Sequence, residues 1–479
     1  MVKPLRLTYV LCAALGAAAG FYVPGAKYLL SIALVVLCFF RVLSSLDPAI
    51  RRMQLTALYS AVFAAGLSLG FCASQAGRVN IYFGIDEKKI TAINGVLLED
   101  PRIISGGRIM AAVSLKECAG AGRLRATATG ELLVFFPEES AARLKEFGRG
   151  TTVYTEGKLR ASGTGWTYSA ESLHIVKPAS ALERMRTGIR LNITERFSGS
   201  QWGGLALALL VGIRDNLDVN LSVLYRNAGC SFILALSGMH LAVLASLIAL
   251  LLKKPLGLKL SAIAGAVIII LYCFIVGPMP SLNRAALMYL LGVLAVLGAF
   301  PKEPLSILAL SFLLQIIISP ASGNSISFIL SYAALAGILI IGMPLYSLLS
   351  GKAPDFILQP FTASCGAFLA TAGITAFTFG IIAPVGIAAG LLLVPLTTIF
   401  MIGSMLWLVL DFASFSFILN VPLSVLYQLM EKTVSIAGRV AGISGKPFAI
   451  IALSLVISLL IIRLQHRQRA AILKQQLFS

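Results

Sequence analysis

Residues 229–252 form an apolar stretch that is long enough to cross a lipid bilayer as one helix. Ser237, Gly238 and His240 lie near the middle of this predicted span. A polar or titratable group at that depth is costly unless it faces protein or water, so such groups mark functional pathways more often than they occur by accident. We therefore expect functional residues in this segment.

A second segment of the same character begins at Pro280. Ser281, Asn283 and Arg284 open the apolar run RAALMYLLGVLAVLGAF and place a permanent cation at or just inside the membrane. Arg284 could present its guanidinium to a phosphate at the mouth of a pore. Equally, its side chain could extend to the outer interface, as arginines near helix ends readily do.

The composition defines the class of protein. Hydrophobic residues make up 58% of the 479 residues and charged residues 12%, which is typical of a polytopic membrane protein. The formal net charge is +19, yet residues 78–196 hold 18 Lys and Arg against 13 Asp and Glu. The apolar remainder therefore carries most of the excess positive charge. Part of it is the ordinary bias of cytoplasmic loops, and it could also hold an anionic substrate along a pore.

Cysteine and histidine usage excludes several kinds of site. The seven cysteines form no CxxC pair, and all but Cys118 lie in or beside apolar runs, which favours a packing role over disulfides or metal binding. Histidine occurs only at positions 174, 240 and 466, which excludes a hydrolase centre built on clustered histidines. We expect no metal and no cofactor.

Hydropathy predicts a polytopic α-helical membrane protein with a small all-β domain inserted in it. The start of the chain mimics a signal peptide, but a second apolar run, Tyr28 to Leu43, follows after a short turn, so an uncleaved helical hairpin is favoured. The predicted parts are about three transmembrane helices in 1–77, a β domain in 78–180, an amphipathic connector in 181–202, a transmembrane domain in 203–463 and a basic cytoplasmic tail in 464–479.

The β domain is predicted from short alternating runs between Gly, Pro and Asp breaks, a pattern that suits a small antiparallel barrel. The connector has helical spacing and four arginines, which indicates a helix on the membrane surface. The run GLALALLVG is too short to cross the bilayer, so a re-entrant or interfacial element is favoured there. Later spans are predicted at 229–252, 260–277, 285–300, 304–319, 326–348, 357–380, 383–410, 413–430 and 447–463.

Loop charge predicts the orientation. With both termini in the cytoplasm, the loop and tail cations of the transmembrane domain fall on the cytoplasmic side, as orientation by charge requires. They are Lys253, Lys254, Lys259, Lys302, Lys352, Arg463, Arg467, Arg469 and Lys474. The predicted crossings number about ten to twelve, and the β domain is extracytoplasmic.

The motifs resemble those of the ComEC/Rec2 family of competence proteins, the inner-membrane channels for DNA uptake. The resemblance rests on ALLVGIRDNLDVNLSVLYRNAGCSFILALSGMHLAVL at 208–244, PSLNRAALMYLL at 280–291 and ISPASGNSISFILSYAALAGILI at 318–340. It implies helices, then a barrel of the OB type, then a helical competence domain. Many members also carry a metallo-β-lactamase-like domain, for which this sequence has too few histidines, so we expect the form without it and a separate nuclease.

The candidate translocation pathway combines both membrane segments with the polar turn before them. Its members are Arg214, Asp215, Ser237, Gly238, His240, Asn283 and Arg284. Ser237 and His240 are three residues apart, so on a helix they would share a face and could line a hydrated path. The alternative is that Ser237 and Gly238 allow close helix packing while His240 bonds a neighbouring carbonyl group. Arg214 and Asp215 could equally form a local polar turn.

The candidate DNA-binding residues of the β domain pair positive charge with aromatic rings, the combination that binds single strands. They are Arg123, Arg125, Lys158, Arg160, Trp166 and Tyr168. Aromatic residues that alternate along strands are more often core residues, and that interpretation stays open.

The leading hypothesis is a channel that passes single-stranded DNA across the cytoplasmic membrane during natural transformation. No GxxxxGK[ST] phosphate loop is present, so energy would come from a partner. The resemblance implies a helicase-like ATPase inside and a DNA receptor outside; membrane lipid is a further partner, and the chain could form a homo-oligomer. The alternatives are a transporter of a small anionic solute and, with least support, a membrane-embedded hydrolase, since no GxSxG elbow or orienting carboxylate accompanies Ser237.

Overall fold

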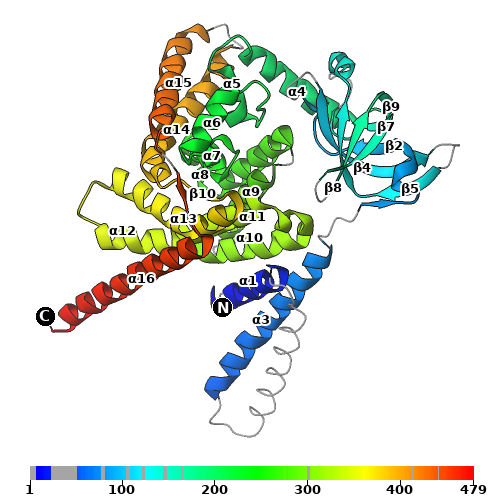
Figure 1. Ribbon diagram of the computed structural model, residues 1–479. Helices are drawn as coiled ribbons and strands as arrows, with labels where there is room; N and C mark the ends of the chain where they lie inside the picture. The colour runs from blue at the N-terminus through cyan, green and yellow to red at the C-terminus, as the bar shows by residue number, and fades with distance from the viewer. Residues whose placement is uncertain are drawn as a thin grey trace.

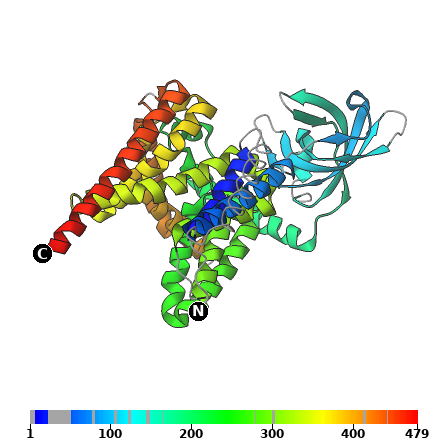
Figure 2. The same cartoon turned by 90° about the horizontal axis from the view of Figure 1, so that it is seen from below.

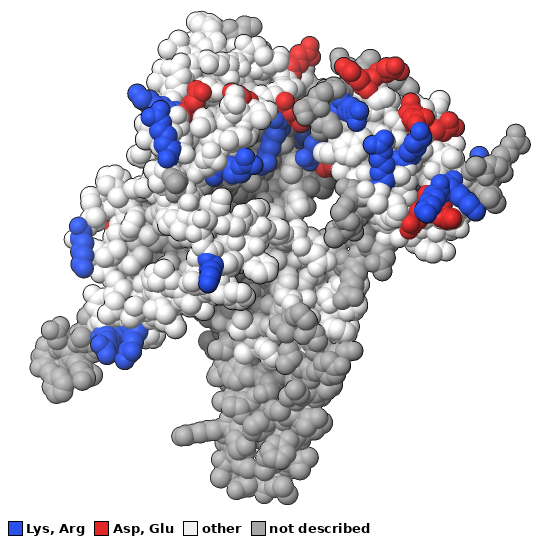
Figure 3. All heavy atoms as spheres, viewed as in Figure 1, with Lys and Arg blue, Asp and Glu red and all other residues white. Residues whose placement is uncertain are grey.

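The computed structural model shows a β-barrel beside a group of helices, with the barrel at one end of the molecule (Figures 1 and 2). It describes residues 7–22, 51–76 and 81–478, apart from 104–107, 121–124, 144–147, 163–164, 278, 299–302, 412–414 and 441. The predicted span from Tyr28 to Leu43 lies outside the described residues. Charged side chains gather on the barrel and the adjoining helices, whereas the helical part shows a mostly uncharged face (Figure 3).

The β domain is a closed barrel of five main strands. Their order is β4-β2-β7-β8-β6, and β6 pairs back with β4 to close the barrel. Only β6 and β8 pair in parallel; the other four pairings are antiparallel, which is the arrangement of an OB fold. The predicted OB-like barrel is confirmed. The strands are β2 (Ile90–Leu97), β4 (Ile109–Gly120), β6 (Glu131–Phe136), β7 (Thr152–Ser162) and β8 (Gly165–Ala170).

Alternation of side chains builds the barrel core. Along β4, Ile109, Ala111, Val113 and Leu115 are buried and the residues between them are less so, as the two-residue period of a strand requires. Shorter strands extend the sheet: β1 (Tyr82–Phe83), β3 (Arg102–Ile103), β5 (Arg125–Thr129) and β9 (His174–Lys177). The barrel therefore has a hydrophobic core of its own.

Six helices within the described residues are long and apolar enough to cross a membrane, which confirms the class of a polytopic helical membrane protein. They are α8 (Gly238–Val276), α9 (Pro280–Leu297), the span Ile326–Leu349, α13 (Asp355–Phe379), α14 (Val385–Asp411) and the first part of α16 (Pro447–Phe478). The span Ile326–Leu349 comprises α11 (Ile326–Gly337), a π-helical turn and α12 (Met343–Leu349). Shorter apolar helices are α10 (Pro304–Ile318) and parts of α1 (Leu7–Tyr22) and α3 (Arg51–Ala76).

The predicted span 229–252 is wrong at its start. Residues 231–234 form the short helix α7, residues 235–237 are not helical, and α8 begins only at Gly238. The α8 helix also includes the next predicted span. It is interrupted at Gly257, two residues after Pro255, where the backbone φ is 71°. A Cβ at Gly265 would touch Ile248, so the two halves of α8 pack against each other as a hairpin.

Several other predicted bounds shift. The predicted crossing at 413–430 is α15 (Phe417–Ala437), which is not among the six membrane-crossing candidates. The predicted tail continues α16 as helix to Phe478. The run GLALALLVG, residues 204–212, lies mostly in the eight-residue helix α5 (Gly203–Leu210), in which all residues but Gly204 are buried. It packs in the largest apolar cluster of the described residues together with α14 and α15.

Candidate functional site

The non-helical residues 235–237 are the centre of the candidate site, because they interrupt the helices and the backbone groups beside the break need other partners. A backbone group in a membrane domain needs a partner from the protein. Arg214 Nη2 donates to the Leu234 carbonyl oxygen at 2.8 Å, and the Ser281 hydroxyl of α9 donates to the Leu236 carbonyl oxygen at 2.9 Å. Side chains distant in sequence therefore supply hydrogen bonds to the backbone carbonyl groups at the interruption.

Ser237 and His240 complete this arrangement as a reciprocal N-cap of α8. The Ser237 hydroxyl oxygen accepts from the Met239 N–H at 3.3 Å, and His240 Nδ1 accepts from the Ser237 N–H at 3.2 Å. Because a backbone N–H can only donate, neutral His240 carries its proton on Nε2. His240 is 1% exposed, and its Nε2 has no hydrogen-bond partner among the described residues. The imidazole therefore keeps one buried donor unused.

Arg284 lies on another interface of α9. Its side chain is 2% exposed, and Nη2 donates to the Ser327 carbonyl oxygen at 2.9 Å. Nε and Nη1 have no hydrogen-bond partner within the described part of the chain. The guanidinium carbon lies 5.6 Å from the ring centroid of Phe328 and 5.9 Å from that of Tyr332, so the ring faces supply part of the stabilisation. Arg284 is therefore a buried cation with two donor nitrogens that the described residues leave unpaired.

The structure brings together some of the predicted pathway residues and separates others. Arg214 and His240 both contact residues 234–237, a segment that includes Ser237. Arg284 instead faces α11, and its neighbour Ala285 faces Gly238. Asp215 follows Arg214 in the same exposed turn, and Asn283 is exposed on α9. Sequence reasoning did not assign Ser281 or Ser327 a role, although Ser281 stands in the same polar group as Arg284.

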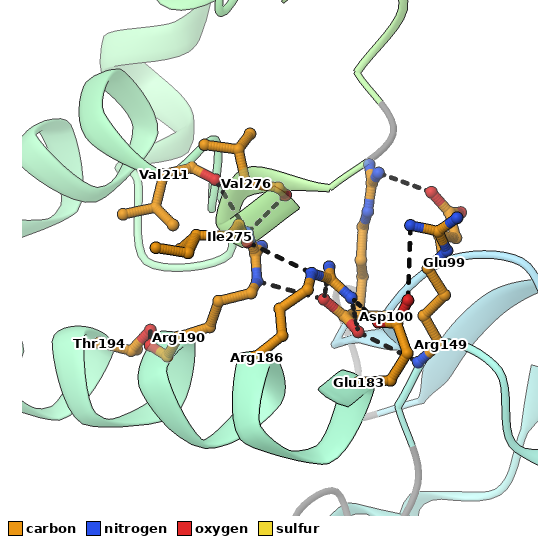
Figure 4. Close-up of polar contacts among 11 residues, drawn as sticks. Glu99, Asp100, Arg149, Glu183, Arg186, Arg190, Thr194, Val211, Ile275 and Val276 are labelled. Atoms are coloured by element: carbon orange, nitrogen blue, oxygen red, sulfur yellow. Dashed lines mark hydrogen bonds and ion pairs between the residues drawn. The ribbon is translucent and has the colours of Figure 1, made fainter. Parts of the chain in front are cut away.

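A second polar cluster joins the barrel to the helices, and sequence reasoning missed it. It lies on α4 (Ala181–Phe197), whose Ser180 N-cap accepts from the Glu183 N–H. Arg186 Nη2 contacts Asp100 Oδ2 of the barrel at 2.6 Å, and Arg190 Nε lies 3.1 Å from the same oxygen (Figure 4). Arg186 also pairs with Glu183 at 2.8 Å.

The same two arginines donate hydrogen bonds to backbone carbonyl groups at the ends of two helices. Arg190 Nη1 donates to the carbonyl oxygens of Val276, Ile275 and Val211, and Arg186 Nε donates to that of Ile275. These carbonyls belong to the last residues of α8 and to the residue after α5, which lack intrahelical partners. Burial lowers the pKa of Arg190, and the Asp100 carboxylate opposes that shift. We call Asp100, Arg186 and Arg190 the barrel clasp.

The predicted amphipathic connector is α4, which also packs against the rest of the protein; its place on the membrane surface stays a prediction. Arg186 is 1% exposed because it is enclosed between α4, the barrel and α8. Arg196, further along α4, pairs with Asp411 at the end of α14 at 2.6 Å. Three of the four arginines of this helix, Arg186, Arg190 and Arg196, bind the protein's own carboxylates or carbonyl groups.

The predicted DNA-binding residues of the barrel that the structure describes fall into three groups. Arg125, Lys158 and Arg160 are exposed, and Lys158 lies 3.9 Å from Glu171. Trp166 is partly buried and packs edge-on against Phe83. Tyr168 is 0% exposed, with its hydroxyl hydrogen-bonded to Thr91 and Thr155, so its ring is a core residue and cannot stack on a base here. Arg123 lies outside the described residues.

Fold and site together define a multi-pass membrane protein that carries an OB-like barrel and a polar interruption before one membrane helix. Across the described chain, no group of three or more His, Cys, Asp or Glu side chains is placed to hold a metal ion. Residues 209–469, more than half of the chain, match the Competence protein family, and the chain belongs to that family of DNA-uptake proteins. No curated protein matches the chain.

Proposed function

We propose that this protein is a membrane channel that passes single-stranded DNA across the cytoplasmic membrane during natural transformation. The observation that supports it best is Arg284, a cation buried among membrane helices, two of whose nitrogen atoms have no hydrogen-bond partner among the described residues. A moving polyanion needs such donors to offset the loss of phosphate hydration, and it needs them in small number so that it is not held. Membership of the Competence protein family supports DNA as the polyanion.

The other pathway residues have a different role in this proposal. Arg214, Ser237 and His240 shape residues 234–237, and the unused Nε2–H of His240 is a neutral donor for a phosphate oxygen. Gly238 leaves room beside α9, while Asp215 and Asn283 lie exposed at the ends of this region. The exposed Arg125, Lys158 and Arg160 of the barrel would contact the strand before it reaches the helices. Energy would come from a helicase-like ATPase.

Removal of the protein should separate DNA binding from DNA uptake. A deletion strain is expected to keep labelled DNA at its surface and to lose labelled DNA in the cytoplasm, because the membrane step alone is missing. The measurement is nuclease-protected label in the cytoplasmic fraction, scored apart from surface label, with the restored gene as control. Undiminished cytoplasmic label in the deletion strain would refute the proposal and favour an anionic solute as cargo.

We further propose that both termini are cytoplasmic and the barrel extracytoplasmic, since loop cations then lie inside. A reporter that is active only outside the cytoplasm should work when fused near Gly150, in the barrel, and stay inactive near Gln468, in α16. A cytoplasmic reporter at the same two positions serves as the matched control. The reverse pattern would place the barrel inside the cell and remove it from the path of incoming DNA.

A further inference from the structure

Arg284 is closed off in this conformation. With 2% of its surface exposed, the guanidinium cannot meet a passing phosphate unless a neighbouring element moves. Phe328 and Tyr332 of α11 flank it, and both belong with Phe312 of α10 to one aromatic cluster. These rings are fixed on two helices that pack together. The end of α1 packs against the same cluster through Phe21.

Two residues of α1 form the cover. The Tyr22 hydroxyl donates to the Gly323 carbonyl oxygen at 2.8 Å, and the Tyr22 ring packs edge-on against that of Phe21, with the ring centroids 4.9 Å apart. A Cβ added at Gly323 would lie 2.6 Å from Phe21 Cζ, so the Phe21 ring rests directly on this glycine. Phe21 also shares a buried cluster with Phe328, which flanks the guanidinium. The cover is thus two rings and one side-chain hydrogen bond.

The cover belongs to a rigid pair of helices. Gly16 and Gly20 of α1 are four residues apart, and so are Gly66 and Gly70 of α3. A Cβ at any of these four positions would overlap the backbone of the partner helix. Such small-residue seams let two membrane helices pack at close range. Phe21 and Tyr22 therefore cannot move far without α3, and α3 leads along the chain to the barrel, where β1 begins at Tyr82.

We propose that the end of α1 is a lid over Arg284, and that the α1–α3 pair moves as one unit to open it to a phosphate diester. The inference rests on the proposed function, because DNA phosphate is taken as the ligand of Arg284. Its physical basis is separate: among the described residues Arg284 Nε and Nη1 have no hydrogen-bond partner, and the end of α1 packs against the aromatic cluster that flanks them. Opening exposes Nε and Nη1, and closing returns Tyr22 to Gly323.

Labelling at position 284 tests the lid without DNA. In Arg284→Cys, a membrane-impermeant maleimide should react slowly at residue 284, as measured by mass spectrometry of that peptide from membrane-inserted protein. Adding Phe21→Ala should raise labelling about tenfold, as expected when a minor open state grows from about 1% to about 10%. Tyr22→Phe, which keeps the ring and removes one hydrogen bond, should raise it by a smaller factor. Phe377→Ala, at a 73% exposed position on α13, is the matched control and should leave it unchanged.

The outcomes separate the lid from the proposed function. Labelling that is equal in Arg284→Cys alone and with either Phe21→Ala or Tyr22→Phe overturns the lid, whatever happens to DNA. If Phe21→Ala protein does not accumulate, Tyr22→Phe decides the question. Increased labelling supports the lid even if Arg284→Gln cells take up DNA normally; that second result would instead refute Arg284 as a phosphate contact.

Discussion

Arg284→Gln is expected to lose most DNA transport while the protein still accumulates in the membrane. Gln keeps a polar side chain that can donate to the Ser327 carbonyl, but it removes the charge beside the Phe328 and Tyr332 rings. Charge-assisted hydrogen bonds contribute about 1.5 to 3 kcal/mol, so cytoplasmic uptake should fall about tenfold or more. The measurement is nuclease-protected cytoplasmic DNA per amount of membrane-inserted protein.

Arg284→Lys separates charge from shape. A moving strand meets the residue at many positions and cannot demand one bidentate geometry, so Lys should keep substantial transport. Arg439→Gln, which changes an exposed arginine after α15, is the matched control and should behave like the parent. Transport in Arg284→Gln equal to that of the parent would take the residue out of the pathway. Loss of both the Gln and Lys variants from the membrane, with the Arg439→Gln control retained, would indicate a packing role for Arg284.

Periodicity in the sequence was enough to predict much of the fold. The barrel follows from alternation: inward positions of β4 are apolar, and the turns carry Gly, Pro or Asp. The long apolar runs predict helices because a lipid-facing backbone must satisfy its own hydrogen bonds. Both signals depend on residues that are close together in the chain, so they can be detected in a single sequence without knowledge of tertiary contacts. The OB topology came from the resemblance, since strand order depends on pairings that no local pattern encodes.

The interruption at residues 235–237 could not be predicted in this way. Hydropathy is continuous from 229 to 252, and the break depends on Arg214 and Ser281, which lie outside that stretch. The i, i+3 spacing of Ser237 and His240 was interpreted as one helix face. The same spacing also fits an N-cap and the third residue of a helix, and the structure shows that arrangement.

Tertiary partners decided the remaining differences. The alternating pattern around Tyr168 fits either a surface or a core aromatic residue. In the structure, its side chain on β8 points into the barrel core. The arginines of α4 have helical spacing that suits a membrane surface, yet Arg186 meets Asp100, 86 residues away in the chain. Because the sequence does not show that Asp100 is the partner of Arg186, the charge of Arg186 was interpreted as solvated. Both positions show that burial is set by distant contacts.

The barrel clasp carries the second large expected effect. Asp100→Ala removes the barrel carboxylate from both Arg186 and Arg190 and leaves a 1% exposed guanidinium with less compensation. Breaking one side of a buried pair costs about 3 to 5 kcal/mol, so the free energy for local opening of α4 should fall by about 3 kcal/mol. Amide hydrogen exchange of α4 in the detergent-solubilised full chain measures this fall directly.

Arg102→Ala is the matched control for the clasp, because Arg102 forms an exposed pair with Glu99 at 2.8 Å in the same loop region. The Arg102→Ala change should alter the free energy for local opening of α4 by no more than about 0.5 kcal/mol, because exposed ion pairs contribute little to stability. Exchange of α4 amides in Asp100→Ala that is no faster than in this control would mean that the carbonyls of Val211, Ile275 and Val276 hold α4 without the barrel. Faster exchange confined to α4 and the end of α8 would make Asp100 the residue that fixes the barrel to the membrane helices.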